Sequence, residues 1–91
     1  MKEILLIEPD SVIALLSEKY LRNNKYEVEH CTDGKDALDL LGSESYDVVL
    51  FEIDLNRLSG LDVLKLMKRQ YADIPFIFYS VNDTKSNRIE A

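Results

Sequence analysis

Four strand-like segments, rich in apolar residues, set the pattern of the chain. The segments 3–8 and 46–53 hold nearly unbroken apolar runs, which is typical of strands that are covered on both faces. The segment 26–31, YEVEHC, alternates apolar and polar residues, as an outer strand with one exposed face does. The segment 74–80, IPFIFYS, has Pro75 near its beginning, where a missing N–H matters least. These four segments are therefore predicted to be strands.

Three amphipathic segments separate the predicted strands and favour helices. The first helix is expected over 12–23, with Asp10 or Ser11 as its N-cap. The second is expected to open at Thr32 or Asp33, and Gly42 supplies a stop signal. The third is expected to start at Ser59 or Gly60. The apolar stripes of the three helices are Val12, Leu15, Leu16 and Tyr20; Ala37, Leu38 and Leu41; and Leu61, Leu64 and Met67.

The order strand, helix, strand, repeated through four strands, predicts one α/β domain over 1–91 with a doubly wound parallel sheet. In such sheets, sites form at the carboxyl ends of the strands, near the point where the strand order reverses. The candidate side chains that follow strand ends are Glu8, Asp10, Glu52, Asp54 and Ser80. We expect them to gather at one edge of the sheet.

Composition narrows the possible partners. The formal net charge of −6 and the pI of about 4.6 argue against a nucleic-acid-binding surface, which would need a basic patch. The N-terminal segment is neither a signal peptide nor a membrane span, and the single cysteine, Cys31, suits a reducing compartment. We therefore expect a cytoplasmic protein without a membrane partner. The lone histidine, His30, is expected to be structural, because no second metal ligand accompanies it.

Several motifs together resemble the receiver domain of two-component response regulators. These are ILLIEPD, the pair Asp33-Gly34, DVVLFEIDLNRLSG and IPFIFYS, in register from Ile4 to about Val81. The resemblance implies the flavodoxin-like receiver fold with strand order 2-1-3-4. It also implies that the fifth strand of that fold is missing from this chain, whose C-terminal part is incomplete.

The resemblance also implies positions for the family's functional groups. The acidic pair that holds Mg²⁺ falls on Glu8 and Pro9, the phosphoacceptor falls on Glu52, and the switch hydroxyl falls on Ser80. The backbone carbonyl that joins the metal site belongs to Asp54. Pro9 has no ligand atom in its side chain, and Glu52 is longer than the expected aspartate by one C–C bond of about 1.5 Å. The lysine of a fifth strand is absent, and phosphoryl transfer depends on such positioning and charge neutralisation.

We therefore interpret the sequence as a receiver-like signalling module, not an enzyme, that is degenerate at its phosphoacceptor position and acts through protein contact. The alternative is a phosphoaccepting regulator that uses Mg²⁺ with Glu52 or Asp54 as acceptor. No tightly bound cofactor is expected, although Glu8, Asp10 and Asp54 offer oxygen ligands for weak Mg²⁺ binding. Two readings of Glu52 are open: a fixed anion that stands in for a phosphoryl group, or a residue that drifted in once phosphorylation had lost its importance.

The implied partners are proteins. A histidine kinase or an output domain is expected from the resemblance. Without a fifth strand, the fourth strand leaves an apolar edge, FIFY, and exposed edges of this kind pair with other strands. A homodimer through the edge of the fourth strand is therefore expected.

Overall fold

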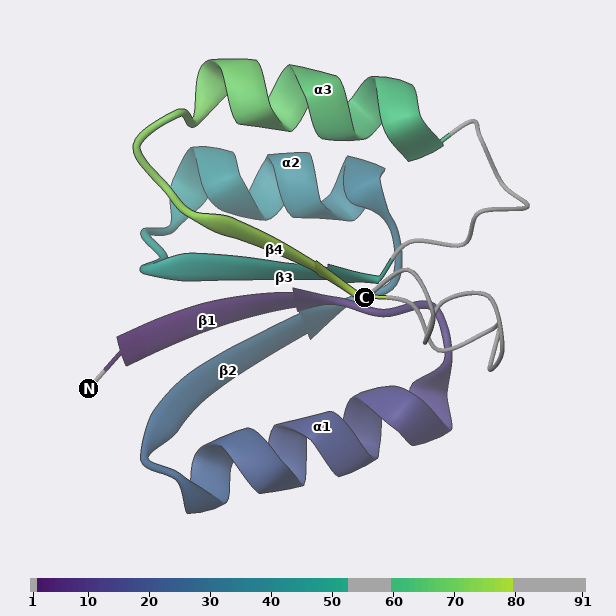
Figure 1. Ribbon diagram of the computed structural model, residues 1–91, viewed down its shortest axis with the longest axis vertical. Helices are drawn as coiled ribbons and strands as arrows, with labels where there is room; N and C mark the ends of the chain where they lie inside the picture. The colour runs from purple at the N-terminus through teal and green to yellow at the C-terminus, as the bar shows by residue number, and fades with distance from the viewer. Residues whose placement is uncertain (1, 53–59, 80–91) are drawn as a thin grey trace.

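The computed structural model describes residues 2–52 and 60–79, and their side chains except those of 60–63. In this part of the chain, four strands alternate with three helices (Figure 1). The elements are β1 (Lys2–Ile7), α1 (Ser11–Asn23), β2 (Tyr26–Cys31), α2 (Gly34–Ser43), β3 (Val48–Glu52), α3 (Gly60–Gln70) and β4 (Phe76–Tyr79). The element order that was predicted from the hydrophobic pattern is confirmed.

The four strands form one parallel sheet in the order β2-β1-β3-β4. This is the predicted doubly wound order, and the reversal falls between β1 and β3. Ile7 pairs with both Cys31 and Phe51, and Glu52 pairs with Tyr79. The carboxyl ends of all four strands therefore lie at the same edge of the sheet. β2, at one side of the described sheet, buries only Val28 and Cys31, as its alternating sequence predicts.

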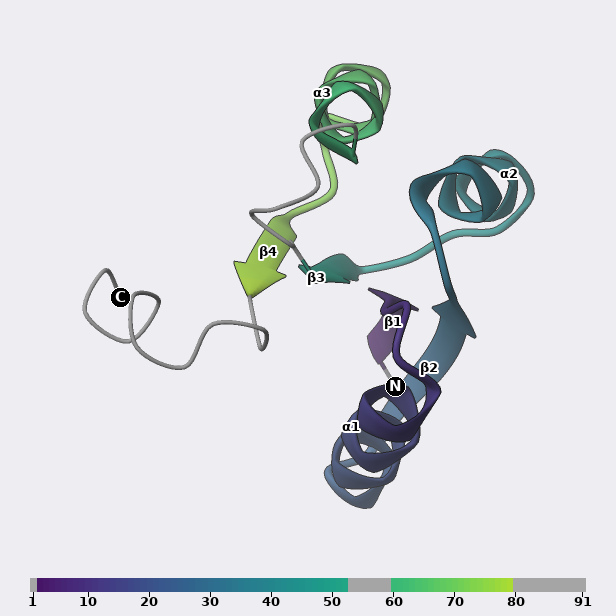
Figure 2. The same cartoon turned by 90° about the vertical axis from the view of Figure 1, so that its right-hand side faces the viewer.

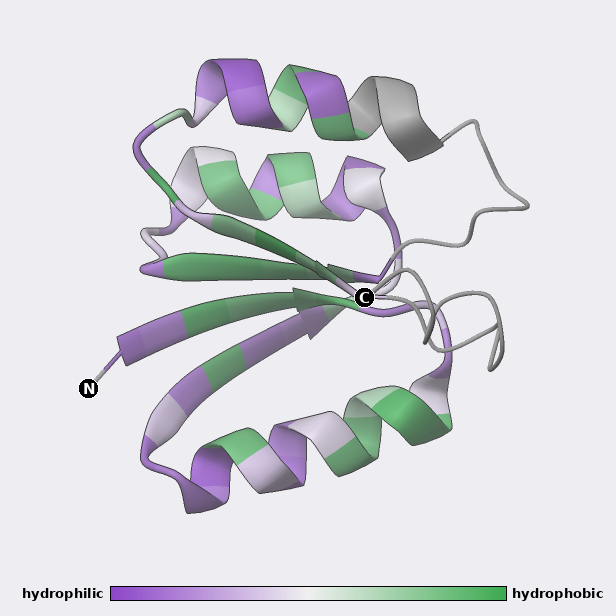
Figure 3. Cartoon of the chain, viewed as in Figure 1, coloured by the Kyte–Doolittle hydropathy of each residue, from purple (hydrophilic) through white to green (hydrophobic). Residues whose placement is uncertain are grey.

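The helices divide between the two faces of the sheet, with α2 and α3 on one face and α1 on the other (Figures 1 and 2). Two hydrophobic clusters fill the spaces between the layers. The cluster on the α2 and α3 face holds Leu5, Ile7, Cys31, Ala37, Leu41, Tyr46, Val49, Phe51, Leu64 and Met67. The cluster on the α1 face holds Ile4, Leu6, Ala14 and Val28. Figure 3 shows the concentration of hydrophobic residues in β1 and β3, the central strands of the described sheet.

The predicted inner faces of α2 and α3 are confirmed where the structure describes them. Ala37 and Leu41 of α2, and Leu64 and Met67 of α3, are buried, and Leu38 packs against them. The side chain of Leu61 lies outside the described residues. Gly42 does not end α2 as predicted: the helix runs through Ser43, and the Glu44 N–H closes its last turn on the Leu40 carbonyl at 2.8 Å.

The apolar stripe of α1 is the main departure from expectation. Val12, Leu15, Leu16 and Tyr20 have exposed fractions of 59–69%, although their spacing is that of a buried face. The sheet is instead contacted by a neighbouring row of the helix, where Ala14 is buried and Leu21 is half-buried. The small side chain at 14 leaves room for the helix to lie close to β2. The stripe itself lies beside that contact row.

The helices α1 and α2 each carry an aspartate N-cap, Asp10 and Asp33. The Asp10 Oδ1 accepts hydrogen bonds from the N–H groups of Val12 and Ile13 at 2.9 and 3.0 Å. Asp33 Oδ1 accepts one from the Asp36 N–H at 2.9 Å. These bonds satisfy N–H groups that have no partner within the helix. Among the described helices, none is long and apolar enough to cross a membrane.

Candidate functional site at the carboxyl end of the sheet

Two glutamates are buried where the central strands end. Glu8 directly follows β1, and Glu52 is the last residue of β3; their exposed fractions are 1% and 5%. Because Ile7 pairs with Phe51, the next residues on the two strands, Glu8 and Glu52, come side by side. Alternation along the strands puts both side chains on the α1 face of the sheet, in line with Leu6 and Leu50. Burial of carboxyl groups is expensive, so their partners decide what this site can do.

Every polar atom of Glu8 has a partner. The Tyr79 hydroxyl donates to Glu8 Oε1 at 2.6 Å, and the Asp10 N–H donates to Glu8 Oε2 at 3.1 Å. The backbone N–H of Glu8 donates to the Cys31 carbonyl at 3.0 Å. Its carbonyl lies 2.8 Å from His30 Nε2, which must be the donor because a carbonyl oxygen can only accept. Glu8 therefore joins the ends of β1, β2 and β4 and the start of α1.

The structural role predicted for His30 agrees with this contact. Its ring nitrogen is bonded to the main chain of β1, and no group of three or more His, Cys, Asp or Glu side chains among the described residues is arranged to hold a metal ion. Cys31 is a buried free thiol. Burial, and then the charges of Asp36, Asp33 and Glu29, raise the pKa of this thiol to about 12, so it is a poor nucleophile.

Tyr79 stays protonated because of its surroundings. Burial is the main cause that raises the pKa of its hydroxyl well above the usual value, followed by the hydrogen bond to Glu8 and the charges of Glu8 and Glu52. A protonated phenol is a hydrogen-bond donor. The 2.6 Å separation from the Glu8 carboxyl oxygen is at the short end of the range for a hydrogen bond donated by a hydroxyl.

The described donors fit a divalent cation poorly. Both carboxylate oxygens of Glu8 already accept hydrogen bonds, and the Oδ1 of Asp10 caps α1. Pro9 is exposed and has no ligand atom in its side chain. Mg²⁺ needs near-ideal octahedral geometry with oxygen ligands and several waters. Glu8 is also 1% exposed, so an ion could reach its carboxylate only if the groups that cover it, Tyr79 among them, moved.

The predicted site residues are only partly brought together. Glu8 and Glu52 adjoin, whereas Asp10 is exposed and serves as a cap. Asp54 and Ser80 lie outside the described residues. Sequence reasoning missed Tyr79, which it treated as one more apolar residue of the fourth strand. The available signal was its position: a polar-tipped aromatic at a strand end, in line with Glu52.

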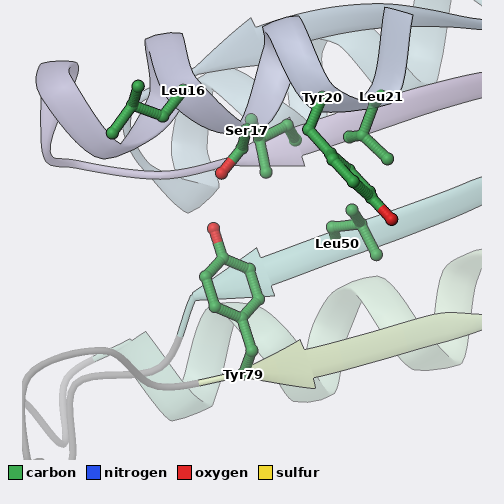
Figure 4. Close-up of a pocket in the computed structure, with 7 residues that line it drawn as sticks. Leu16, Ser17, Tyr20, Leu21, Leu50 and Tyr79 are labelled. Carbon is green, nitrogen blue, oxygen red and sulfur yellow. The ribbon is translucent and has the colours of Figure 1, made fainter. Parts of the chain in front are cut away.

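An apolar groove extends from this site along α1. It has a volume of about 380 Å³ and is lined by Leu6, Leu16, Ser17, Tyr20, Leu21, Leu50 and Tyr79. In Figure 4, the α1 side chains form one wall, Leu50 of β3 lies opposite, and the Tyr79 ring rises from the end of β4. Tyr79 thus belongs to two features: its ring lines the groove, and its hydroxyl bonds to Glu8.

Comparison with known proteins places this geometry in a family. The family model described as the response regulator receiver domain matches residues 4–91. The response regulator SaeR of Staphylococcus aureus is 32% identical over 91 residues, and the chain spans 40% of the length of that relative.

Solved structures agree with the family match. The receiver domain of the Francisella response regulator 1452 is 29% identical, with a TM-score of 0.78 that covers 99% of this chain and 74% of the other. A similar match is given by a chain of the solved complex between the histidine kinase ThkA and the response regulator TrrA of Thermotoga maritima. There the identity is 27% and the TM-score 0.79, covering 94% of this chain and 74% of the other. Together with the strand order 2-1-3-4, these matches show that the chain belongs to the response regulator receiver domain family.

Proposed function

We propose that this receiver domain signals without being phosphorylated, through contact with another protein. The observation that carries the proposal is the state of the acidic end of the sheet. The carboxylate of Glu8 is bonded to Tyr79 and to the start of α1, and the acceptor position is filled by the longer Glu52. Phosphoryl transfer requires a metal, a well-placed nucleophile and compensating positive charge. The described residues supply none of these in the usual form.

The proposed partner is a protein of the same signalling system. TrrA was solved with a histidine kinase, so a kinase or an output domain is the class of partner that we propose here. The exposed apolar residues of α1 and of β4 offer a surface for such a contact, because large exposed patches of this kind mark interaction sites. Cys31 is a buried free thiol, which suits the reducing cytoplasm that we propose as its compartment.

Treatment with a small phosphodonor tests the proposal. We expect incubation with acetyl phosphate and Mg²⁺ to leave the intact mass of the protein unchanged, while a phosphoaccepting regulator treated in parallel gains about 80 Da, one phosphoryl group. The matched variant Glu52→Asp, which shortens the side chain, isolates the effect of the extra methylene group. A stoichiometric adduct on the wild type that disappears in Glu52→Gln would establish the alternative, a phosphoaccepting regulator.

We also propose that two copies pair along β4. This strand lies at one side of the described sheet, with Ile77 52% and Phe78 37% exposed. No other strand of residues 2–52 and 60–79 pairs with its outer edge, which offers N–H and C=O groups to a second copy, and a charged residue there blocks such pairing. Sedimentation equilibrium should therefore give a dimer at micromolar concentration for the wild type and a monomer for Ile77→Lys.

A matched variant locates the contact. Val12 is 65% exposed and belongs to α1, so it takes no part in strand pairing along β4, and Val12→Lys should remain dimeric. Dissociation by Val12→Lys but not by Ile77→Lys would place the interface on α1. A folded wild-type monomer at high concentration would refute dimerisation altogether.

A further inference from the structure

The strands bring Tyr79 to the acidic end of the sheet from the α1 side. Tyr79 pairs in register with Glu52, and its ring packs against the cluster of Ile4, Leu6, Ala14 and Val28. Leu6 and Leu50 line the groove beside the ring. These contacts limit the rotation of the side chain. The hydroxyl is thereby held where it meets the Glu8 carboxylate at 2.6 Å.

The Glu8 carboxylate is closed to other ligands. It is 1% exposed, one oxygen is bonded to Tyr79, and the other is bonded to the Asp10 N–H. Each carboxylate oxygen could accept a second contact, but the group is buried, so a cation could reach it only by moving the groups that cover it, and the Tyr79 hydroxyl at 2.6 Å is one of them. Loss of a buried hydrogen-bond partner is unfavourable because the remaining group is desolvated without compensation. The tyrosine therefore competes with metal ions for the same oxygen atom.

Resting on the proposed function, we propose that the Tyr79 hydroxyl substitutes for a divalent cation at this end of the sheet. It latches Glu8 to the end of β4 by a hydrogen bond and excludes metal from the carboxylate. A metal ion would join the strand ends only when it is bound, whereas the tyrosine joins β1 to β4 permanently. The acidic end of the receiver then has one arrangement at every Mg²⁺ concentration. Tyr79 acts here as a positioning residue.

The test compares two tyrosine-to-phenylalanine variants. Tyr79→Phe removes the hydroxyl but keeps the ring in the groove. Tyr46→Phe is the matched control, because its hydroxyl also donates to a glutamate, Glu29, at 2.8 Å, and Tyr46 is 8% exposed on the other face of the sheet. Mn²⁺ serves as the probe, and its free concentration is read from the electron paramagnetic resonance signal.

We expect Tyr79→Phe to bind one Mn²⁺ about tenfold more tightly than the wild type, and Tyr46→Phe to bind as the wild type does. Addition of Glu8→Gln to Tyr79→Phe should abolish the gain. Equal affinities in Tyr79→Phe and the wild type would overturn the latch, and so would an equal gain in Tyr46→Phe.

A second measurement on the wild type covers the case in which Tyr79→Phe does not fold. The Tyr79 hydroxyl proton should give a slowly exchanging proton resonance that persists through a Mg²⁺ titration. Loss of that resonance on addition of Mg²⁺ would overturn the proposal. The two proposals can fail separately: a phosphoryl adduct on the wild type contradicts the proposed function, whereas absence of both an adduct and a gain in Mn²⁺ affinity contradicts only the latch.

Discussion

Leu5→Ala is expected to lower the free energy of unfolding by 2–5 kcal/mol, the range observed for buried leucines. Leu5 is fully buried in the cluster between the sheet and α2 and α3. Its truncation removes apolar contacts and leaves a cavity, and the stability of folded domains is small enough for such a loss to matter. Urea denaturation followed by circular dichroism measures the loss.

Leu15→Ala is the matched control on α1. Leu15 is 59% exposed, so the same truncation there should change the free energy of unfolding by no more than about 0.5 kcal/mol. Ile7→Val, a milder change at a buried site, should cost about 0.5–1.5 kcal/mol and gives a reading if Leu5→Ala does not fold. Equal losses for Leu5→Ala and Leu15→Ala would mean that the α1 stripe is buried after all.

The domain is expected to lose stability steeply in alkaline solution. Burial raises the pKa of the Cys31 thiol from 9.0 to about 12, and burial with a glutamate hydrogen bond raises the pKa of the Tyr46 and Tyr79 hydroxyls above the usual 10.0. Above these ordinary values, the unfolded chain loses protons that the folded chain keeps, so the free energy of unfolding falls as pH rises. Each group contributes about 1.4 kcal/mol per pH unit within its window.

Urea midpoints between pH 7 and 11 measure this dependence. Below about pH 9, these three groups should not make the free energy of unfolding depend on pH. At higher pH the free energy should fall, with a combined slope of about 4 kcal/mol per pH unit where all three groups contribute. Tyr79→Phe should remove about a third of that slope. An unchanged slope in both Tyr79→Phe and Tyr46→Phe would contradict the assignment.

The fold could be predicted from the sequence because its signals are local. Unbroken apolar runs indicated β1 and β3, alternation indicated β2, and aspartates marked the starts of α1 and α2. The prediction that was wrong is the burial of the apolar stripe of α1. Periodicity identifies an apolar stripe, but it cannot say whether the sheet contacts that stripe or the row beside it. The buried residue of the contacting row is the small Ala14, and a side chain with little apolar surface adds little to a hydrophobic pattern.

The sequence allowed us to predict the acidic residues of the site, but not the groups that form hydrogen bonds with them. Topology alone brings Glu8 and Glu52 to one edge, as expected. The bond between Glu8 and Tyr79 joins residues that are 71 positions apart in sequence, and it depends on the register of β3 with β4. The β3–β4 register and the packing of the Tyr79 ring beside α1 depend on the tertiary structure, and no local sequence pattern indicates them. The N-cap role considered for Asp10 is confirmed, and its role as a metal ligand stays a prediction.

The most direct test of the central claim is an amide NMR spectrum of the wild type with Mg²⁺ and beryllium trifluoride, a mimic of the phosphoryl group. The resonances to follow are those of Glu8, Glu52 and Tyr79, which lie at the strand ends where both ligands would bind. If the receiver works without phosphorylation, these three amides should keep their positions at saturating concentrations of both reagents. A second set of peaks for them, appearing with the mimic and requiring Mg²⁺, would contradict the account.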